Sequence, residues 1–171
     1  MIGTREQHEA ARADLLEREK EHMRRGDELA RRRRELPWVP VEEEYVFQTT
    51  AGERTLTDLF EGRSQLLVLD DLQAYRERMG WKFDWVSSEG TAFNRDLGAT
   101  TGGGEQPGFS VFVLEDGVVH HTYSSWDRGC EIIDGAYHLI DLSPKGRQED
   151  GLGQTGWWWR LHDEYEQAPV A

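Results

Sequence analysis

The single thiol is the first residue to test for chemistry. Cys130 is the only cysteine among 171 residues, so the chain can form no internal disulfide, Cys-x-x-Cys pair or cysteine-rich zinc site. It follows Arg128 near the start of a predicted helix, and both features favour a reactive thiolate. The alternative is a small packing residue. We favour packing, because no second cysteine can resolve an oxidised product.

The six histidines raise the question of a metal site. His120 and His121 are adjacent, and neighbours on a strand point to opposite faces of the sheet, so the two cannot chelate one ion together. His138 and His162 lie far apart in the sequence, and neither an His-x-His nor an His-Glu-x-x-His spacing occurs. We therefore predict no metal and no cofactor.

Serines and aromatic residues give weaker signals. No Gly-x-Ser-x-Gly turn occurs, and neither 87–88 nor 124–125, the two Ser-Ser pairs, has a local catalytic signature. A Ser/His/Asp set assembled in space stays open. Several aromatic residues and one arginine could line a binding pocket near the end of the sheet, although a core with polar edges is the favoured alternative. They are Trp81, Trp85, Tyr123, Trp126 and Arg128.

Three consecutive tryptophans, Trp157, Trp158 and Trp159, form the most unusual local feature. Neighbouring residues on a helix are about 100° apart, so the three cannot all face one core. Tryptophan is enriched at the anchors of protein interfaces. We therefore predict that this run contacts the N-terminal arm in a dimer.

The first element behind these residues is a long N-terminal arm. Thr4 and Gln7 fit a capping box, and residues 5–35 are rich in the good helix formers Ala, Leu, Glu and Arg. We expect Gly26 to break this helix and Pro37 to end it. Its apolar stripe is thin, so it needs a partner surface on its own domain or on a second subunit.

The remaining pattern predicts an α/β domain with a mixed sheet. A strand at 45–48 and its return at 54–56 form a hairpin, and 57–60 form a capped helical turn. The continuous apolar run 65–69 predicts a strand buried on both faces. A helix from Asp70 or Asp71 to Met79, a strand at 83–86, a hairpin of 109–114 with 118–123, and a helix over 127–142 follow.

Charge divides the chain into two parts. Residues 1–36 have a net charge of +1 and residues 37–171 one of −14, giving −13 in all. An acidic body disfavours nucleic acid. Arg31 to Arg34 form one basic run, which could be an RNA-binding or targeting patch. We favour a solvated helix face, or a patch that docks on the acidic body.

Composition sets the remaining bounds. Hydrophobic residues make up 37% and mean hydropathy is −0.76, while seven Trp, six Phe and five Tyr still provide a packed core. No apolar run approaches the roughly 20 residues of a membrane helix, and the N-terminus lacks a secretory-signal pattern. We expect one domain, no membrane partner and a cytoplasmic location.

This order of elements resembles a thioredoxin-like protein of the peroxiredoxin kind. Residues 52–62, followed by an apolar strand, are similar to the opening of that fold, and Pro107 stands where the fold often places a cis-proline beside its active site. The chain is more closely similar to a poorly characterised bacterial thioredoxin-like family, a domain of unknown function. The resemblance runs from the arm almost to Tyr165. Its motifs include Leu36-Pro37-Trp38-Val39, Arg78-Met79-Gly80-Trp81, His121-Thr122-Tyr123-Ser124 and Asp141-Leu142-Ser143-Pro144-Lys145-Gly146-Arg147.

The departure from this family decides the functional hypothesis. In the family, the strand after Gln65 leads into a cysteine-bearing loop, a helix and a further strand. Here Leu69 runs straight into Asp70, so the segment with the Cys-x-x-Cys-like motif is absent, through a natural deletion or an edited chain. The loss predicts an unpaired edge or an exposed apolar face, covered by the arm, by residues 152–165 or by a second subunit.

The resemblance and its departure together imply an N-terminal helical arm (1–36) and a truncated thioredoxin-like domain (37–171). The leading hypothesis is a dimeric, non-catalytic binding or scaffold module of unknown physiological role. The alternative is a thiol-dependent peroxide or disulfide oxidoreductase that uses Cys130 with an external thiol. A third hypothesis is RNA binding through Arg31 to Arg34.

Overall fold

The computed structural model describes residues 3–49, 52–70 and 86–149. The chain divides into two compact units, Met1–Cys130 and Glu131–Ala171, each described here by itself. Several predicted features lie outside the described residues. They are the helix through Met79, nearly all of the strand at 83–86, and the candidates Trp81, Trp85, Trp157, Trp158 and Trp159.

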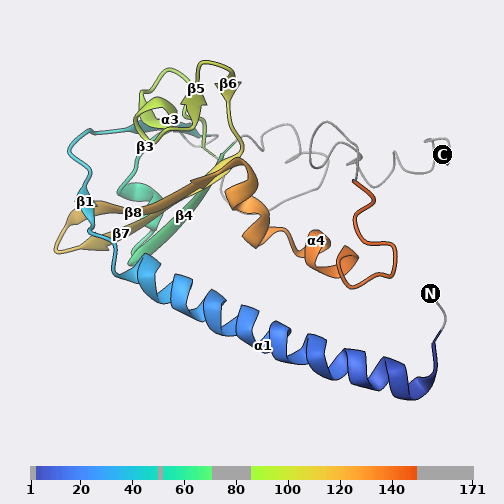
Figure 1. The fold of residues 1–171 in the computed structure, drawn as a ribbon. Coiled ribbons are helices and arrows are strands. Elements are labelled where there is room, and N and C mark those ends of the chain that lie inside the picture. Colours follow the sequence, from blue (N-terminus) through green and yellow to red (C-terminus); the bar gives the residue numbers. More distant parts are fainter. Residues whose placement is uncertain (1–2, 50–51, 71–85, 150–171) are drawn as a thin grey trace, which may run out of the picture. The chain divides into compact units, whose positions relative to one another are not determined.

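The N-terminal arm is one continuous helix, α1 (Arg5–Arg34), shown in blue in Figure 1. Its capping box is confirmed, since the Thr4 hydroxyl accepts from the Gln7 amide at 3.2 Å and the Gln7 side chain accepts from the Thr4 amide at 2.9 Å. The predicted break at Gly26 is wrong. Ion pairs one turn apart support the helix on both sides of this glycine, such as Arg18 with Asp14 and Arg32 with Glu28.

Four strands form the main sheet, in the order β1-β8-β7-β4. Their bounds are β1 Val39–Pro40, β4 Gln65–Asp70, β7 Gly108–Glu115 and β8 Val118–Trp126. The predicted hairpin is confirmed as β7 and β8, which turn at Asp116 and Gly117, both with positive φ. Every pairing in this sheet is antiparallel. An α/β architecture is therefore present, but the described sheet is antiparallel where a mixed one was expected.

Strand β4 differs from its prediction in burial. Within the described residues it pairs only with β7, so it lies at the edge of the described sheet. Leu67 is 51% exposed and Leu69 39%, whereas Leu66 and Val68 pack against the core. The prediction of burial on both faces is wrong, because a continuous apolar run has the same appearance at an edge as in the middle of a sheet.

An aromatic cluster fills the core on one side of the sheet. Phe93 begins the short helix α3 (Phe93–Asp96), and its ring centroid lies 5.1 Å from that of Tyr45, 5.0 Å from Phe47 and 6.0 Å from Phe112. The two contacts of Phe93 with Tyr45 and Phe47 have the edge-to-face geometry that aromatic quadrupoles favour. The predicted hairpin, β2 (Val46–Thr49) with β3 (Gly52–Thr55), thereby packs onto the sheet. A smaller hairpin, β5 (Thr100–Thr101) with β6 (Gly104–Glu105), follows α3.

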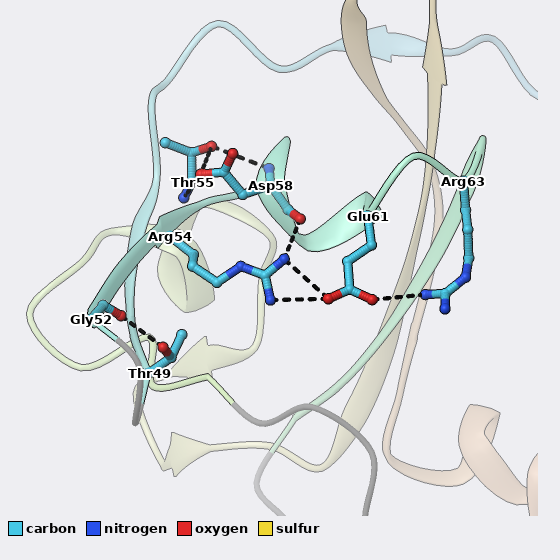
Figure 2. Close-up of polar contacts among 7 residues, drawn as sticks. All are labelled: Thr49, Gly52, Arg54, Thr55, Asp58, Glu61 and Arg63. Carbon is cyan, nitrogen blue, oxygen red and sulfur yellow. Dashed lines mark hydrogen bonds and ion pairs between the residues drawn. The ribbon is translucent and has the colours of Figure 1, made fainter.

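Reciprocal hydrogen bonds join Thr55, the last residue of β3, to Asp58, the first residue of the helical turn η1 (Asp58–Phe60), as Figure 2 shows. The predicted cap at the start of this turn is absent, since its N-cap Thr57 makes no side-chain capping hydrogen bond. The Asp58 carboxylate accepts from the Thr55 amide and hydroxyl at 2.8 Å each, and the Thr55 hydroxyl accepts from the Asp58 amide at 3.2 Å. These hydrogen bonds hold the pKa of Asp58 below its usual value. After the turn, Glu61 adopts a left-handed conformation and its carboxylate pairs with Arg54 and Arg63.

The helix predicted over 127–142 is two short helices. The 3-10 helix η2 (Asp127–Ile133) ends before Asp134, whose carboxylate caps α4 (Gly135–Ile140) by accepting from the Ala136 amide at 3.0 Å. Capping favours a new helix start at this position. In the unit from Glu131 onward, the Arg147 guanidinium lies 3.8 Å from the Tyr137 ring centroid and pairs with Asp141 at 2.6 Å.

Replacing Gly26 by alanine tests the continuity of α1. A Cβ at this position meets no atom within 4 Å. Gly26→Ala should therefore stabilise the helix by about 1 kcal/mol, through the lower conformational entropy of alanine in the unfolded chain. Amide hydrogen exchange along α1 should slow, and far-UV circular dichroism should show no loss of helix. Faster exchange around residue 26 would contradict a continuous helix.

Candidate functional site

Cys130 and Pro107 meet at the end of the sheet where β7 begins and β8 ends. The Cys130 sulfur lies 3.1 Å from the Ser125 carbonyl oxygen and 3.7 Å from that of Pro107. Both oxygens accept the S–H, and neither can stabilise a thiolate. The expected cis bond at Pro107 is wrong, since the described residues contain no cis peptide.

Tyr123 has a different set of contacts. It lies on β8 opposite Val111, and its ring centroid is 5.9 Å from that of Phe109. The Arg33 guanidinium lies 5.4 Å from the Tyr123 ring centroid, so a cation–π contact joins the last turn of α1 to the sheet. Arg128 is exposed in η2. Of the predicted pocket residues that are described, Tyr123 therefore contacts the arm, whereas Pro107 contacts Cys130.

The two adjacent histidines point to opposite faces, as predicted. His121 pairs with Phe112 and lies 5.5 Å from that ring, on the side of the aromatic core. His120 pairs with Val113 and lies 6.0 Å from the Trp38 ring.

A β-bulge brings His121 to a serine that sequence reasoning left without a role. The register passes from Val111 opposite Tyr123 to Phe112 opposite His121, so Thr122 is an extra residue on β8. Its hydroxyl donates to the Val111 carbonyl at 3.0 Å. Residues three apart on a regular strand face opposite sides, and the bulge cancels this alternation. The His121 Nε2 atom consequently lies 2.7 Å from the Ser124 Oγ atom.

Ser110 extends this pair into a chain of three side chains. It lies on β7 opposite Ser124, is fully buried, and its hydroxyl is 2.8 Å from that of Ser124. His121 and Ser124 are half-buried. The Ser110–Ser124–His121 chain is therefore hydrogen-bonded from the buried interior of the hairpin to its partly exposed side.

The protonation state of His121 follows from its surroundings. Burial lowers the pKa of this imidazole below 6.5, and a hydrogen bond with the Tyr123 backbone partly opposes the shift. The ring is neutral at pH 7, with one nitrogen protonated and the other able to accept. The hydrogen bond between Nε2 and the Ser124 hydroxyl can form in either ring tautomer. In the tautomer that leaves Nε2 unprotonated, this atom accepts the Ser124 hydroxyl proton. This arrangement polarises the Ser124 hydroxyl as a base polarises a nucleophile.

Two searches of the described residues gave negative results. No group of three or more His, Cys, Asp or Glu side chains there is arranged to hold a metal ion. Among the helices of those same ranges, none has the length and apolar character needed to cross a membrane.

The described residues form an α/β architecture that contains a long N-terminal helix and a four-stranded antiparallel sheet. The chain belongs to the family described as bacterial protein of unknown function (DUF899), whose model matches residues 1–71 and 68–165. The two matched segments meet at 68–71, where the sequence places the short join. No curated protein and no solved structure matches the chain.

The buried imidazole predicts a pH dependence of stability. In the unfolded chain His121 takes up a proton near pH 6.5, whereas in the fold its pKa is lower. The unfolded state thus binds more protons, and stability falls as pH drops below 6.5 toward the folded pKa. His121→Gln should remove this part of the decline in melting temperature between neutral pH and about pH 5. An unchanged slope in the variant would show that His121 is not its source. The contribution of Asp58 to stability is lost only below its unfolded pKa near 3.8, so the effects of Asp58 and His121 on stability occur in different pH ranges.

Proposed function

We propose that the protein is a thioredoxin-like binding module without thiol-redox turnover, which self-associates through its N-terminal helix. The observation that carries this proposal is α1, a helix of 30 residues in which none is buried. A helix of this length with exposed leucines requires a partner surface that covers its apolar side chains. The physiological role that this association serves is unknown.

The sheet supports the thioredoxin-like part of the proposal. The strand that the resemblance places before the cysteine-bearing loop is β4, which lies at the edge of the described sheet with Leu67 and Leu69 exposed. An exposed apolar edge is the expected result of losing a neighbouring strand and helix. The meeting of the two family matches at 68–71 agrees with a loss at this point.

The surroundings of Cys130 support the absence of thiol turnover. Reactive cysteines are activated by positive charge or by backbone N–H groups. The Cys130 sulfur faces two carbonyl oxygens, from Ser125 and Pro107, which favour the protonated thiol. The same contacts fit the packing role that the sequence favours.

Charge along α1 favours a second copy of this chain as the partner. Residues 5–21 have six acidic and four basic side chains, whereas residues 22–36 have three acidic and six basic ones. An antiparallel pair of arms places each acidic half beside a basic half, and a parallel pair places like charges together. Leu15 and Leu29 are 50% and 48% exposed and lie equally far from residue 22. In an antiparallel pair centred on residue 22, Leu15 of one chain would lie beside Leu29 of the other.

The basic run is already engaged within its own chain. Arg31 pairs with Glu28 and Glu35, Arg32 pairs with Glu28, and Arg33 lies over the Tyr123 ring. Carboxylates beside the arginines weaken the field that a nucleic-acid phosphate would meet. This favours a protein partner over RNA. The Trp157 to Trp159 run stays a predicted second contact of the dimer.

Light scattering tests the arm as the interface. The wild-type protein should elute with twice the chain mass of 19.8 kDa, and Leu15→Lys with Leu29→Lys should elute as a monomer. Burying two unpaired ammonium groups in a small interface outweighs its apolar contacts. The matched control is Ala10→Lys with Ala13→Lys, which adds the same charge on the opposite side of the helix and should remain dimeric. A monomeric wild type would refute the proposal.

A thiol assay separates the binding module from the oxidoreductase alternative. Wild type and Cys130→Ser should reduce insulin and peroxide, with dithiothreitol as the external thiol, at the same rate as the uncatalysed background. Wild type and Cys130→Ser should have free energies of unfolding that agree to within about 1 kcal/mol, because serine fits the same site and donates to the same carbonyls. Turnover by the wild type that Cys130→Ser lacks would establish the alternative.

A further inference from the structure

We propose that Ser124 is a nucleophile for small activated acyl esters, with His121 as its general base and Ser110 as a positioning residue. The inference does not depend on the proposed dimer or on the thioredoxin-like resemblance. It rests on the hydrogen-bonded side chains Ser110, Ser124 and His121 in the β7–β8 hairpin, an arrangement that no sequence motif predicts.

The geometry meets the first requirement of a nucleophile and base pair. The Nε2 atom of His121 lies 2.7 Å from the Ser124 Oγ atom, within the hydrogen-bond range that proton abstraction needs. The imidazole is held by the Phe112 ring, 5.5 Å away, and by the Tyr123 backbone. A base whose orientation is fixed by a third group is the general pattern of activated serines.

Ser110 is the second partner of the Ser124 hydroxyl. The Ser110 hydroxyl is fully buried and lies 2.8 Å from that of Ser124, and either oxygen of this pair can donate. In the proposed arrangement Ser110 donates, which leaves the Ser124 proton directed at His121. A serine hydroxyl has one proton, so Ser124 cannot donate to both partners. Ser110 therefore acts through Ser124.

The reaction needs only the ester and water. The Ser124 oxygen forms a bond to the acyl carbon while its proton passes to His121 Nε2. The ester carbon–oxygen bond then breaks, the leaving group departs with the electron pair, and the imidazolium gives its proton to the leaving group or to solvent. Hydrolysis of the acyl-serine by water, with His121 again as base, regenerates the hydroxyl and releases the carboxylic acid.

The experiment uses p-nitrophenyl acetate as the probe and the full chain with Cys130→Ala, so that the thiol does not compete. Release of p-nitrophenolate should be accompanied by one acetyl group on Ser124, located by peptide mass mapping. Ser124→Ala and His121→Gln should each lower the acylation rate about a hundredfold, the usual contribution of general-base catalysis. Ser110→Ala should give an intermediate loss.

Ser125→Ala is the matched control, because Ser125 is the adjacent serine and faces the other side of the strand. This variant should react at the parental rate. The rate should also rise with pH and reach its plateau below pH 6.5, because the acting base is an imidazole whose pKa is lowered by burial. Circular dichroism melts confirm that each variant folds.

Three results would overturn the proposal. One is acetylation spread over surface lysines with no acetyl on Ser124. Another is a folded His121→Gln protein that reacts at the parental rate, which would reduce the chain to a structural hydrogen-bond network. The third is a rate that keeps rising above neutral pH, which points to a lysine or tyrosine nucleophile.

Discussion

The pairing of β7 with β8 is the constraint on which the rest of the described fold depends. These two strands lie in the middle of the sheet, between β1 and β4. Their register requires a very close approach at one end, where a Cβ on Gly108 would lie 1.7 Å from the Trp126 ring. Only glycine permits this contact. The Trp126 ring can therefore pack directly against the β7 backbone at Gly108, at the same end of the sheet as Pro107 and Cys130.

The same pairing determines where polar side chains lie. An antiparallel hairpin with regular alternation would separate His121 from Ser124, and the extra residue Thr122 prevents this. Burying two hydroxyls and an imidazole next to Phe112 is unfavourable unless each polar group has a partner. The hydrogen-bonded chain supplies those partners within the hairpin itself. Stability and the proposed nucleophile thus depend on the same bulge.

How far the sequence predicted this structure depends on the range of each signal. The capping box at Thr4, the turn at Asp116 and Gly117, and the strands beside it were predictable because adjacent residues determine them. The position of β4 at the edge of the described sheet was not, because it depends on which strands are its neighbours. The bulge at Thr122 has no sequence signature, so the approach of Ser124 to His121 was missed. Asp134, followed by Gly135, was the only signal that one predicted helix is two.

A cation–π contact connects the arm to the sheet. Arg33 lies over the Tyr123 ring, while its neighbours Arg31 and Arg32 pair with acidic residues of the helix itself. A cation–π contact is modest in energy, about 0.5 to 1 kcal/mol when exposed. A contact of this size can orient the last turn of a helix but cannot hold 30 residues against a surface.

The ion pairs along α1 explain how the helix persists with no buried residue, since each contributes locally. They do not explain why Leu15, Leu16, Met23 and Leu29 are exposed on it. Exposed apolar side chains are unfavourable on an isolated helix in water, and they stabilise a helix that buries them against a partner. The exposed leucines of the arm therefore favour association through α1 rather than through the sheet.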